Sequence, residues 1–355
     1  MTSVLIVDDS AFIRRVVRDV VSACSDLRVI GEAVSGEDAI AQVHALNPDV
    51  VTLDLDMPGL GGLGALGYLM SECPRPVVVL SGGDVGEGVD MTIRALELGA
   101  VDFVRKPSVG NALDLATLAE RLVPALRTAA VGRAVAPVAS ASLVRPWRQS
   151  SLGAAARPVR TPTVGPTRWV VVIAASTGGP RALAELLPQL GASLGAAVLV
   201  AQHMPSAFTP TLATRLDEAC VLRVVEATDG DQVLTGVVYI APGGRHMEVV
   251  RGLIRLDDAP ADLGVRPAAD RLFASAAADY GSRVLAVVLT GMGRDGALGA
   301  QRIVASGGQL LIQDPSTCVV SGMGQAAMST GVAHRVQTIG ELAQTIMAVC
   351  AGAGD

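Results

Sequence analysis

Three short polar segments in the second half of the chain contain the residue types of a serine hydrolase. Ser176 lies in Ala-Ser-Thr-Gly-Gly-Pro, His203 in Gln-His-Met-Pro and Asp295 in Gly-Met-Gly-Arg-Asp-Gly. A serine nucleophile needs a base that takes its proton and a carboxylate that orients the base. The three segments therefore predict an acyl-transfer site in which Ser176 attacks, His203 is the base and Asp295 orients it.

Each of these segments directly follows a short apolar run, over residues 169–175, 196–201 and 284–289. Runs of this length that are rich in valine, alanine and leucine favour buried parallel strands. Open α/β sheets gather their ligands at the carboxyl ends of the strands. We therefore expect the three polar side chains to meet at one edge of a sheet.

The turn after Ser176 also suits the charge that develops during acyl transfer. Two glycines allow a sharp turn, and the proline that follows them suits the first turn of a helix. Exposed N–H groups and the helix dipole at such a turn stabilise an oxyanion. We expect Thr177 and the backbone N–H of Met292 to help hold it.

Each candidate also has a structural alternative. Ser176 taken alone is typical of a helix N-cap, and Asp295 is typical of an Asx turn. His246, which follows Ala-Pro-Gly-Gly in a loop, and His334, near the C-terminus, compete with His203 as the base. The position of His203 at a predicted strand end favours His203.

The first half of the chain carries a different device, a cluster of carboxylates. Asp8 and Asp9 end the first predicted strand, Asp54 ends the third, Ser81 ends the fourth, and Lys106 follows the fifth. Carboxylates that converge at neighbouring strand ends need a counter-ion, and Mg²⁺ prefers oxygen ligands. The cluster predicts a site where Mg²⁺ and Lys106 stabilise a phosphoryl group that passes to Asp54.

The bulk composition excludes several classes of protein. Half of the 355 residues are hydrophobic but only 3% are aromatic, so we expect aliphatic cores. A net charge of −6 argues against a nucleic-acid partner. No apolar run approaches the roughly 18 residues that span a bilayer, and no secretory signal is visible at the N-terminus. Five cysteines without metal-type spacing are typical of reduced thiols. We expect a cytoplasmic protein that does not insert into membranes.

Strand-like and helix-like stretches alternate in two separate parts of the chain. This alternation predicts two α/β domains with doubly wound parallel sheets, over residues 1–127 and 168–355. Residues 128–167 are rich in alanine, proline and arginine and lack regular apolar spacing, which predicts a flexible linker.

The first half resembles the receiver domain of two-component response regulators. The resemblance rests on Val-Asp-Asp-Ser at 7–10, Leu-Asp-Leu-Asp-Met-Pro at 53–58 and Lys-Pro at 106–107. It implies a flavodoxin-like fold and phosphorylation of Asp54, with a CheA-type histidine kinase as the phosphodonor. The residues that it assigns are Asp8, Asp9, Asp54 and the backbone carbonyl of Asp56 for Mg²⁺, and Ser81, Phe103 and Lys106 for the switch.

The second half resembles the CheB methylesterase domain. The three segments described first carry this resemblance, together with Ala-Pro-Gly-Gly at 241–244, Arg-Pro at 266–267 and Cys-Val-Val at 318–320. It implies a Rossmann-like domain that hydrolyses glutamate methyl esters, and deamidates glutamines, on the cytoplasmic helices of methyl-accepting chemoreceptors. No cofactor is implied for the ester hydrolysis. Such an enzyme tunes adaptation in bacterial chemotaxis or a related chemosensory pathway.

Three departures from the family pattern lie outside the predicted triad. Ser321 stands where the family usually has an aromatic residue, Gly324 where it has proline, and Ala268-Ala269 where it favours Ser-Val. We expect these departures to affect the grip on the substrate and not the type of reaction.

Two other functions compete with hydrolysis. A non-enzymatic adaptor would be favoured if a triad residue were missing, but all three are present. A DNA-binding response regulator predicts a compact basic helical output domain, whereas this one is long, α/β and acidic.

The two halves have a joint use if the first controls the second. An unphosphorylated first domain that covers the Ser176 edge of the sheet would block hydrolysis through a modest, partly polar interface. A phosphoryl group on Asp54 would draw in Ser81 and reorient Phe103. We expect these shifts to move the population toward an open form.

Overall fold

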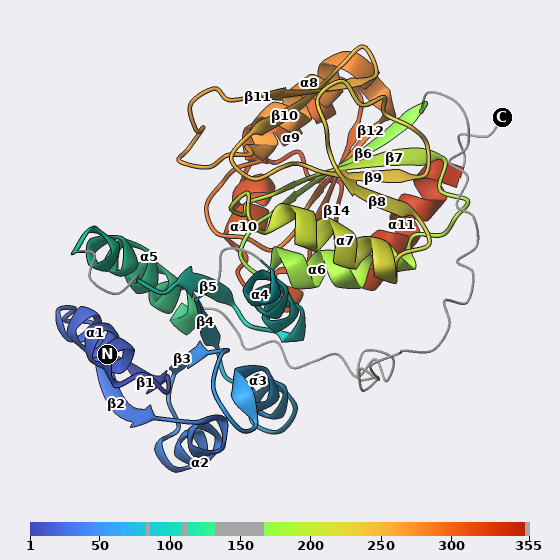
Figure 1. Cartoon of the computed structure of the whole chain (residues 1–355). Helices are drawn as coiled ribbons and strands as arrows, with labels where there is room; N and C mark the ends of the chain where they lie inside the picture. The colour runs from blue at the N-terminus through green and yellow to red at the C-terminus, as the bar shows by residue number, and fades with distance from the viewer. Residues whose placement is uncertain (83–85, 108–111, 132–166, 352–355) are drawn as a thin grey trace, which may run out of the picture.

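The computed structural model describes residues 1–82, 86–107, 112–131 and 167–351. Within these ranges the chain forms two units, each built on a parallel sheet (Figure 1). Most of the predicted linker 128–167 lies outside the described residues, and its first four residues, 128–131, belong to a helix. None of the described helices is both long enough and apolar enough to cross a bilayer.

The first unit is a sheet of five strands with helices on both faces. Its strands are β1 (Thr2–Val7), β2 (Leu27–Ala33), β3 (Val50–Asp54), β4 (Val77–Ser81) and β5 (Asp102–Arg105). Its helices are α1 (Ala11–Ser22), α2 (Gly36–Leu46), α3 (Gly61–Glu72), α4 (Glu87–Leu98) and α5 (Ala112–Val131). The strand order β2-β1-β3-β4-β5, with every pair parallel, confirms the predicted doubly wound sheet.

The second unit is a larger parallel sheet with an added hairpin. Its sheet strands are β6 (Trp169–Ala175), β7 (Ala196–Gln202), β8 (Arg223–Glu226), β9 (Val237–Ile240), β12 (Val284–Val288), β13 (Gln309–Gln313) and β14 (Arg335–Gln337). Its helices are α6 (Gly179–Leu186), α7 (Thr209–Ala219), α8 (Ala269–Tyr280), α9 (Ala297–Ala305), α10 (Gly322–Ser329) and α11 (Ile339–Ala351). Short 3₁₀ turns lie at Leu187–Gln189, Gly281–Arg283 and Pro315–Thr317, and β10 (His246–Val250) pairs antiparallel with β11 (Leu253–Asp257).

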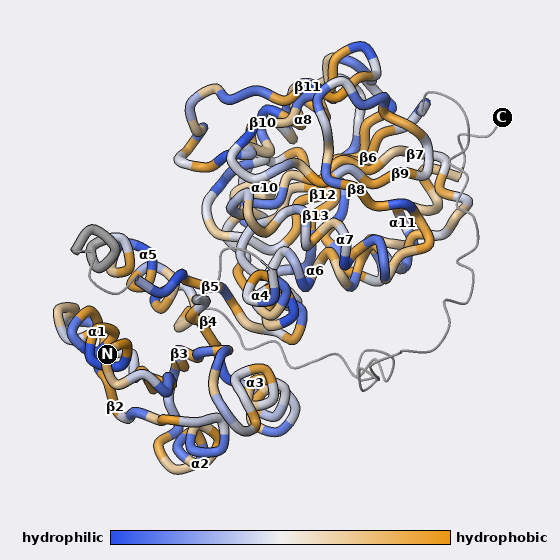
Figure 2. The backbone as a smooth tube through the Cα atoms, in the orientation of Figure 1, coloured by the Kyte–Doolittle hydropathy of each residue, from blue (hydrophilic) through white to orange (hydrophobic). Residues whose placement is uncertain are grey.

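Apolar residues on both faces of the second sheet explain its layers. Val171 and Ile173 of β6 belong to the core cluster that includes α6, α7 and α11, whereas Val170 and Val172 belong to the cluster of α8, α9 and α10. Strands β6, β7 and β9 are accordingly apolar along their length (Figure 2). A strand covered on both faces has no polar side to expose, so it is a continuous apolar run and not an alternating one.

The order of the second sheet, β14-β13-β12-β6-β7-β9-β8, brings the three polar segments together. The chain builds outward from β6 in one direction and from β12 in the other, so the strand order reverses between these two neighbours. Ligands of open α/β sheets bind outside the carboxyl ends of the strands at such a switch point. Ser176 follows β6, His203 follows β7 and Asp295 follows β12, which places all three at this edge.

Candidate active site and phosphoryl-acceptor site

The turn between β6 and α6 presents Ser176. Its backbone N–H donates to the Thr290 carbonyl at 3.1 Å, which ties the end of β6 to the end of β12. Gly178 has a φ of 78° and is the N-cap of α6, and no side chain caps this helix. The N-cap alternative for Ser176 is therefore wrong. At Gly179 a Cβ would lie 2.0 Å from the Gln202 amide oxygen, so a larger residue would displace the Gln202 side chain.

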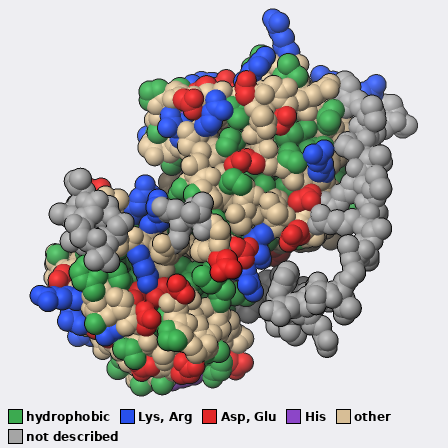
Figure 3. All heavy atoms as spheres, in the orientation of Figure 1, with side chains coloured by type: hydrophobic (Ala, Val, Ile, Leu, Met, Phe, Trp, Pro, Cys, Tyr) green, Lys and Arg blue, Asp and Glu red, His purple; other side chains and the backbone are tan. Residues whose placement is uncertain are grey.

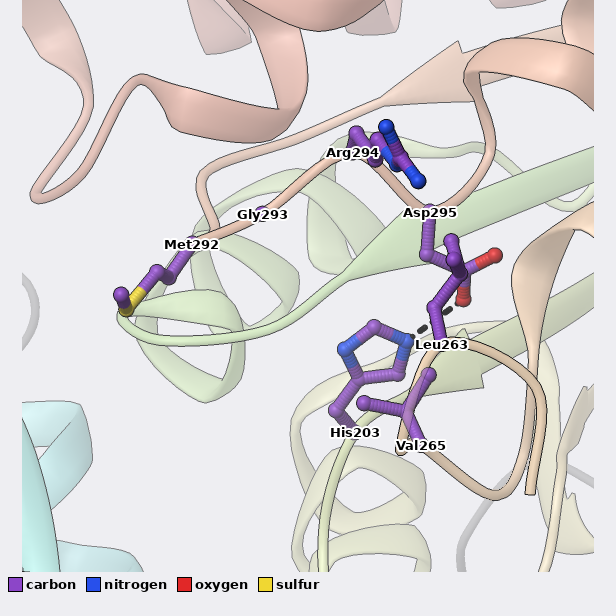
Figure 4. Close-up of a pocket in the computed structure, with 7 residues that line it drawn as sticks. All are labelled: His203, Leu263, Val265, Met292, Gly293, Arg294 and Asp295. Atoms are coloured by element: carbon purple, nitrogen blue, oxygen red, sulfur yellow. Dashed lines mark hydrogen bonds and ion pairs between the residues drawn. The ribbon is translucent and has the colours of Figure 1, made fainter.

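His203 and Asp295 form the expected pair of base and orienting carboxylate. His203 Nε2 lies 2.8 Å from Asp295 Oδ2, and both side chains are nearly buried (Figure 4). The backbone N–H of His203 donates to the Ala175 carbonyl at 3.0 Å. The Gln202 amide donates to the Ser176 and His203 carbonyls, at 3.0 Å each. The ends of β6 and β7 are thereby held in register, with the imidazole beside the serine turn.

The carboxylate of Asp295 is held by the first turn of α8 as well as by the histidine. It accepts hydrogen bonds from the backbone N–H of Ala269 at 2.6 Å, of Asp270 at 2.9 Å and of Gly296 at 3.0 Å. Burial opposes ionisation, but the bonds from His203 and from these N–H groups outweigh it and lower the pKa of Asp295. An Asx turn would need a bond from the Ala297 N–H, two residues on, but that N–H donates to the Arg294 carbonyl at 3.2 Å. The four bonds to Asp295 instead fix an anion beside the imidazole.

The nucleophile and the base are neighbours without a direct bond. Among the described residues, no hydrogen bond joins the Ser176 hydroxyl to His203, and His203 Nδ1 has no partner. Catalytic contacts are often loose without substrate and tighten when it binds. At Gly291 a Cβ would lie 2.8 Å from the Ser176 Cβ, so the loop after β12 passes directly beside the nucleophile.

His203 and Asp295, but not Ser176, border an open cavity of about 500 Å³. It is lined by His203, Leu263, Val265, Met292, Gly293, Arg294 and Asp295 (Figure 4). The backbone N–H of Met292 donates to no acceptor among the described residues, and Met292 is 56% exposed. An unpaired donor at the cavity wall is the kind of group that an oxyanion site needs.

The competing histidines are structural. His246 is fully buried, with Nε2 3.1 Å from the Pro260 carbonyl and Nδ1 accepting from the Ala268 N–H at 3.2 Å. His334 Nδ1 accepts from the Leu310 N–H at 3.1 Å, next to β13. At each histidine a backbone donor occupies Nδ1, and neither lines the cavity.

The departures from the family pattern leave the triad's supports intact. Ala268 and Ala269 act through their backbone N–H groups, which bind His246 and Asp295, so these supports do not depend on their side chains. Ser321 accepts a hydrogen bond from Gln325 at 2.8 Å at the start of α10, and Gly324 is buried in that helix.

The aspartate cluster of the first unit also forms as expected. Carboxylate oxygens of Asp8, Asp9 and Asp54 lie within 4.8 Å of one another. Lys106 Nζ lies 2.8 Å from Asp8 Oδ2 and 2.7 Å from Asp54 Oδ2. Both contacts are ion pairs, but their angles are not those of regular hydrogen bonds. Asp56 does not belong to this cluster of side chains, and its N–H donates to Asp54 at 3.0 Å.

Electrostatics at this cluster favour a cation. Burial, together with repulsion from Asp54, raises the pKa of Asp8 against the opposing effect of Lys106. Burial works to lower the pKa of Lys106, but Asp54 and Asp8 outweigh it and raise that pKa. Three convergent carboxylates, with only Lys106 of the described side chains to balance their charge at the cluster, are a hard-oxygen donor set that fits a divalent metal ion.

The predicted switch residues connect this cluster to the second unit. The Ser81 hydroxyl lies 2.8 Å from the Thr92 hydroxyl of α4, and the Ser81 carbonyl accepts from the Lys106 N–H at 2.8 Å. Phe103 packs on Phe208 of the second unit, with ring centroids 4.4 Å apart. A shift of Phe103 would therefore change its packing on Phe208 across the interface.

Charged residues lock the same interface. The two units meet where α4 lies against α6 and α7 (Figure 1), and acidic and basic side chains gather at this junction (Figure 3). Arg215 of α7 binds Glu97 through two hydrogen bonds of 3.0 and 2.6 Å and Asp90 through one of 3.0 Å. The first unit therefore lies against α6, the helix that follows the serine turn, and against α7.

Sequence reasoning missed several residues that shape the two sites. Gln202 supports the serine turn, Thr92 is bonded to Ser81, and Arg215 joins the units. Asp102 meets Thr177 across the interface. Only Gln202 had a visible signal, a polar residue at the end of an apolar run. The other contacts depend on the packing of distant segments.

Comparisons with known proteins agree with this geometry. Residues 4–117 match the family described as the response regulator receiver domain, and residues 171–346 match the family described as CheB methylesterase. A protein-glutamate methylesterase/protein-glutamine glutaminase of Symbiobacterium thermophilum is 43% identical over 97% of this chain and 95% of its own length. One from Pyrococcus horikoshii is 41% identical over 97% of this chain and 92% of its own length. The crystal structure of the Thermotoga maritima CheB methylesterase catalytic domain has 40% identity and a TM-score of 0.50, and covers 51% of this chain and 98% of that chain.

Proposed function

Because this chain belongs to the family of CheB methylesterases that carry a receiver domain, we propose that it is a protein-glutamate methylesterase and protein-glutamine glutaminase that acts on chemoreceptors under phosphorylation control. The observation that carries the catalytic assignment is the 2.8 Å contact between His203 and Asp295, held beside Ser176 at the switch point of the sheet. The substrate sites are glutamate methyl esters and glutamines on the cytoplasmic helices of the receptor.

The protonation states follow from the partners of the imidazole. Asp295 is ionised and accepts from His203 Nε2, which keeps the proton on Nε2 and leaves the lone pair on Nδ1. Nδ1 then takes the proton of Ser176 as its Oγ attacks the γ-carbonyl carbon of the ester. Asp295 stabilises the imidazolium that forms.

The tetrahedral intermediate needs donors for its oxyanion. The Thr177 hydroxyl and the N–H of Met292 serve this role. His203 returns its proton to the leaving group, so methanol departs from an ester and ammonia departs from an amide. Water activated by His203 then cleaves the glutamyl-enzyme and frees the glutamate.

The first unit supplies control. Asp54 accepts a phosphoryl group from a CheA-type histidine kinase. Asp8, Asp9 and Asp54, with the backbone carbonyl of Asp56, would hold Mg²⁺, which neutralises charge during the transfer. Lys106 lies close enough to Asp54 to pair with the phosphoryl oxygens. Ser81 and Phe103 then carry the change to the interface.

Methanol release tests the catalytic assignment. Purified full-length protein with a small phosphodonor should release methanol from membranes that contain methylated chemoreceptor, and Ser176→Ala should not. Release at the wild-type rate by Ser176→Ala would remove the proposed nucleophile. An absence of release by the wild type would remove the proposed activity.

A further inference from the structure

An exposed leucine stands at the mouth of the active-site cavity in an unusual backbone conformation. Leu263 has a φ of 52°, is 54% exposed and lines the same cavity as His203. The left-handed region is disfavoured for such a residue because its Cβ approaches the following carbonyl oxygen. Leucine at position 263 therefore costs folding free energy in two ways, through its strained backbone conformation and through its exposed apolar side chain.

The type of turn around Leu263 favours a residue other than leucine. Asp262 and Val265 exchange two backbone hydrogen bonds, of 3.1 and 3.0 Å, and Gly264 follows Leu263 with a φ of 81°. Positive φ at both central residues is the signature of a type I′ turn, where Asn-Gly is the preferred pair. Leucine occupies the position that asparagine would fill with less strain.

Two other non-glycine residues with positive φ occur in the described ranges, and neither shares this combination. Asn47 is of a type that tolerates the left-handed region. Arg251 precedes Gly252 in the hairpin between β10 and β11, and its φ of 54° is close to that of Leu263. A charged side chain suits that exposed turn, and Arg251 does not line the cavity. The two turns are thus a natural pair for comparison.

The loop that presents Leu263 is tied down on several sides. Arg266 donates to the carbonyls of Asp258 at 2.8 Å and Ala259 at 2.9 Å. Arg271 of α8 lies 3.3 Å from Asp262. Strain that a well-anchored segment maintains beside an active site is a mark of function. The anchored loop thus holds the leucine side chain at the wall of the active-site cavity.

Apolar groups lie on both sides of the base. Leu263 and Val265 lie on one side of His203, and Met292 lies across the cavity from them (Figure 4). Arg294 lines the same cavity, and its positive charge attracts a substrate segment that carries carboxylates. A substrate that fits these walls offers a methyl ester or amide to Ser176, an apolar side chain close to it, and acidic character.

We propose that Leu263 is a specificity-determining residue that contacts an apolar side chain of the receptor helix, one turn away from the target glutamate. Residues three or four positions apart lie on the same face of a helix, about 5–6 Å apart, so one side chain can contact the rim while its neighbour enters the cavity. This inference rests on the proposed function of the chain and concerns recognition by the same site.

Leu263→Asn tests the inference, with Arg251→Asn as the matched control. Asparagine suits both turns, so each variant should melt at or slightly above the wild-type temperature, by about 2 °C. In full-length protein with a phosphodonor, Leu263→Asn should raise the KM for methylated receptor about tenfold and leave kcat within about twofold. Arg251→Asn should leave both constants unchanged, and Leu263→Met should restore most of the affinity.

A small ester separates recognition from chemistry. On N-acetylglutamate γ-methyl ester, which has no neighbouring side chain, Leu263→Asn should hydrolyse at the wild-type kcat/KM. Wild-type receptor kinetics for Leu263→Asn would overturn the inference, while methanol release by the wild type would still support the proposed function. An equal loss on the receptor and on the small ester would also overturn it, because Leu263 would then act on the reacting centre. If the wild type releases no methanol from the receptor, the proposed function and the inference about Leu263 are both contradicted.

Discussion

The Thr177 hydroxyl, one residue after the nucleophile, donates a hydrogen bond to Asp102 of the first unit, with 3.5 Å between Thr177 Oγ1 and Asp102 Oδ2. A second contact of the same kind joins the Thr128 hydroxyl to the Met292 sulfur at 3.2 Å. The first unit therefore touches both residues that we propose as oxyanion supports. We expect inhibition by the first unit to lower the rate of the chemical step as well as to restrict access to the cavity.

The contact between Asp102 and Thr177 predicts a pH dependence of this inhibition. Burial raises the pKa of Asp102 from 3.8 to about 6, against smaller opposing effects of the Phe103 N–H, Thr177 and Arg121. A closed form with the raised pKa binds the proton more tightly than an open form whose carboxyl faces water. Closure is therefore strongest below about pH 4 and weakens as the pH rises through about 6.

A ratio of rates isolates this effect. The rate of the unphosphorylated full-length protein, divided by that of a fragment over 168–355, should rise between pH 5 and pH 6 and level off above. The division cancels the pH dependence of the hydrolysis itself, which both proteins share. In Asp102→Asn the ratio should be flat, and a wild-type ratio that is independent of pH would show that Asp102 does not couple to opening.

The ion pairs of Arg215 predict a salt-sensitive latch. Arg215 joins Glu97 and Asp90 across the interface at 3.0 Å or less, with its side chain 25% exposed. Arg215→Ala should raise the unphosphorylated rate of methanol release several-fold, and added salt should raise the wild-type rate but not the variant's. Arg255→Ala is the control, because its partner Asp229 belongs to the same unit. Equal basal rates for wild type and Arg215→Ala would exclude the latch.

Substitutions in the triad should separate nucleophile from orienter. Ser176→Ala should lower kcat by about 10³-fold or more without changing the melting temperature. Asp295→Asn should lose somewhat less activity but also stability, because its carboxylate holds the first turn of α8. Ser329→Ala, an exposed serine of α10, is the control for serine removal. Near-normal turnover by Ser176→Ala would rule out the triad.

Phosphoryl acceptance should depend on Asp54 and on a divalent cation. A labelled small phosphodonor should modify the wild type only with Mg²⁺ present, and the label should be lost in alkali. Asp54→Asn should abolish it, whereas Asp19→Asn, on the exposed face of α1, should not. Label that persists in Asp54→Asn, or that forms in the presence of a chelator, would move the acceptor elsewhere.

The sequence was sufficient for the parts of the fold that local patterns determine. Continuous apolar runs identified β6, β7 and β12, and the switch-point rule placed Ser176, His203 and Asp295 at one edge. Contacts between the units could not be predicted from the sequence, because no local pattern pairs Asp102 with Thr177. The turn at Leu263 was missed for a related reason, since Leu-Gly lacks the Asn-Gly signature that such turns normally show.

The most direct test of phosphorylation-controlled hydrolysis compares four rates of methanol release from methylated receptor membranes. Full-length protein and the 168–355 fragment are each measured with and without a small phosphodonor. The fragment spans the length of a catalytic domain whose structure was solved by itself, so it should fold alone. We predict that phosphodonor accelerates the full-length protein toward the fragment's rate and leaves the fragment unchanged. An unphosphorylated full-length protein as fast as the fragment would contradict control by the first unit, and four rates at background would contradict the esterase itself.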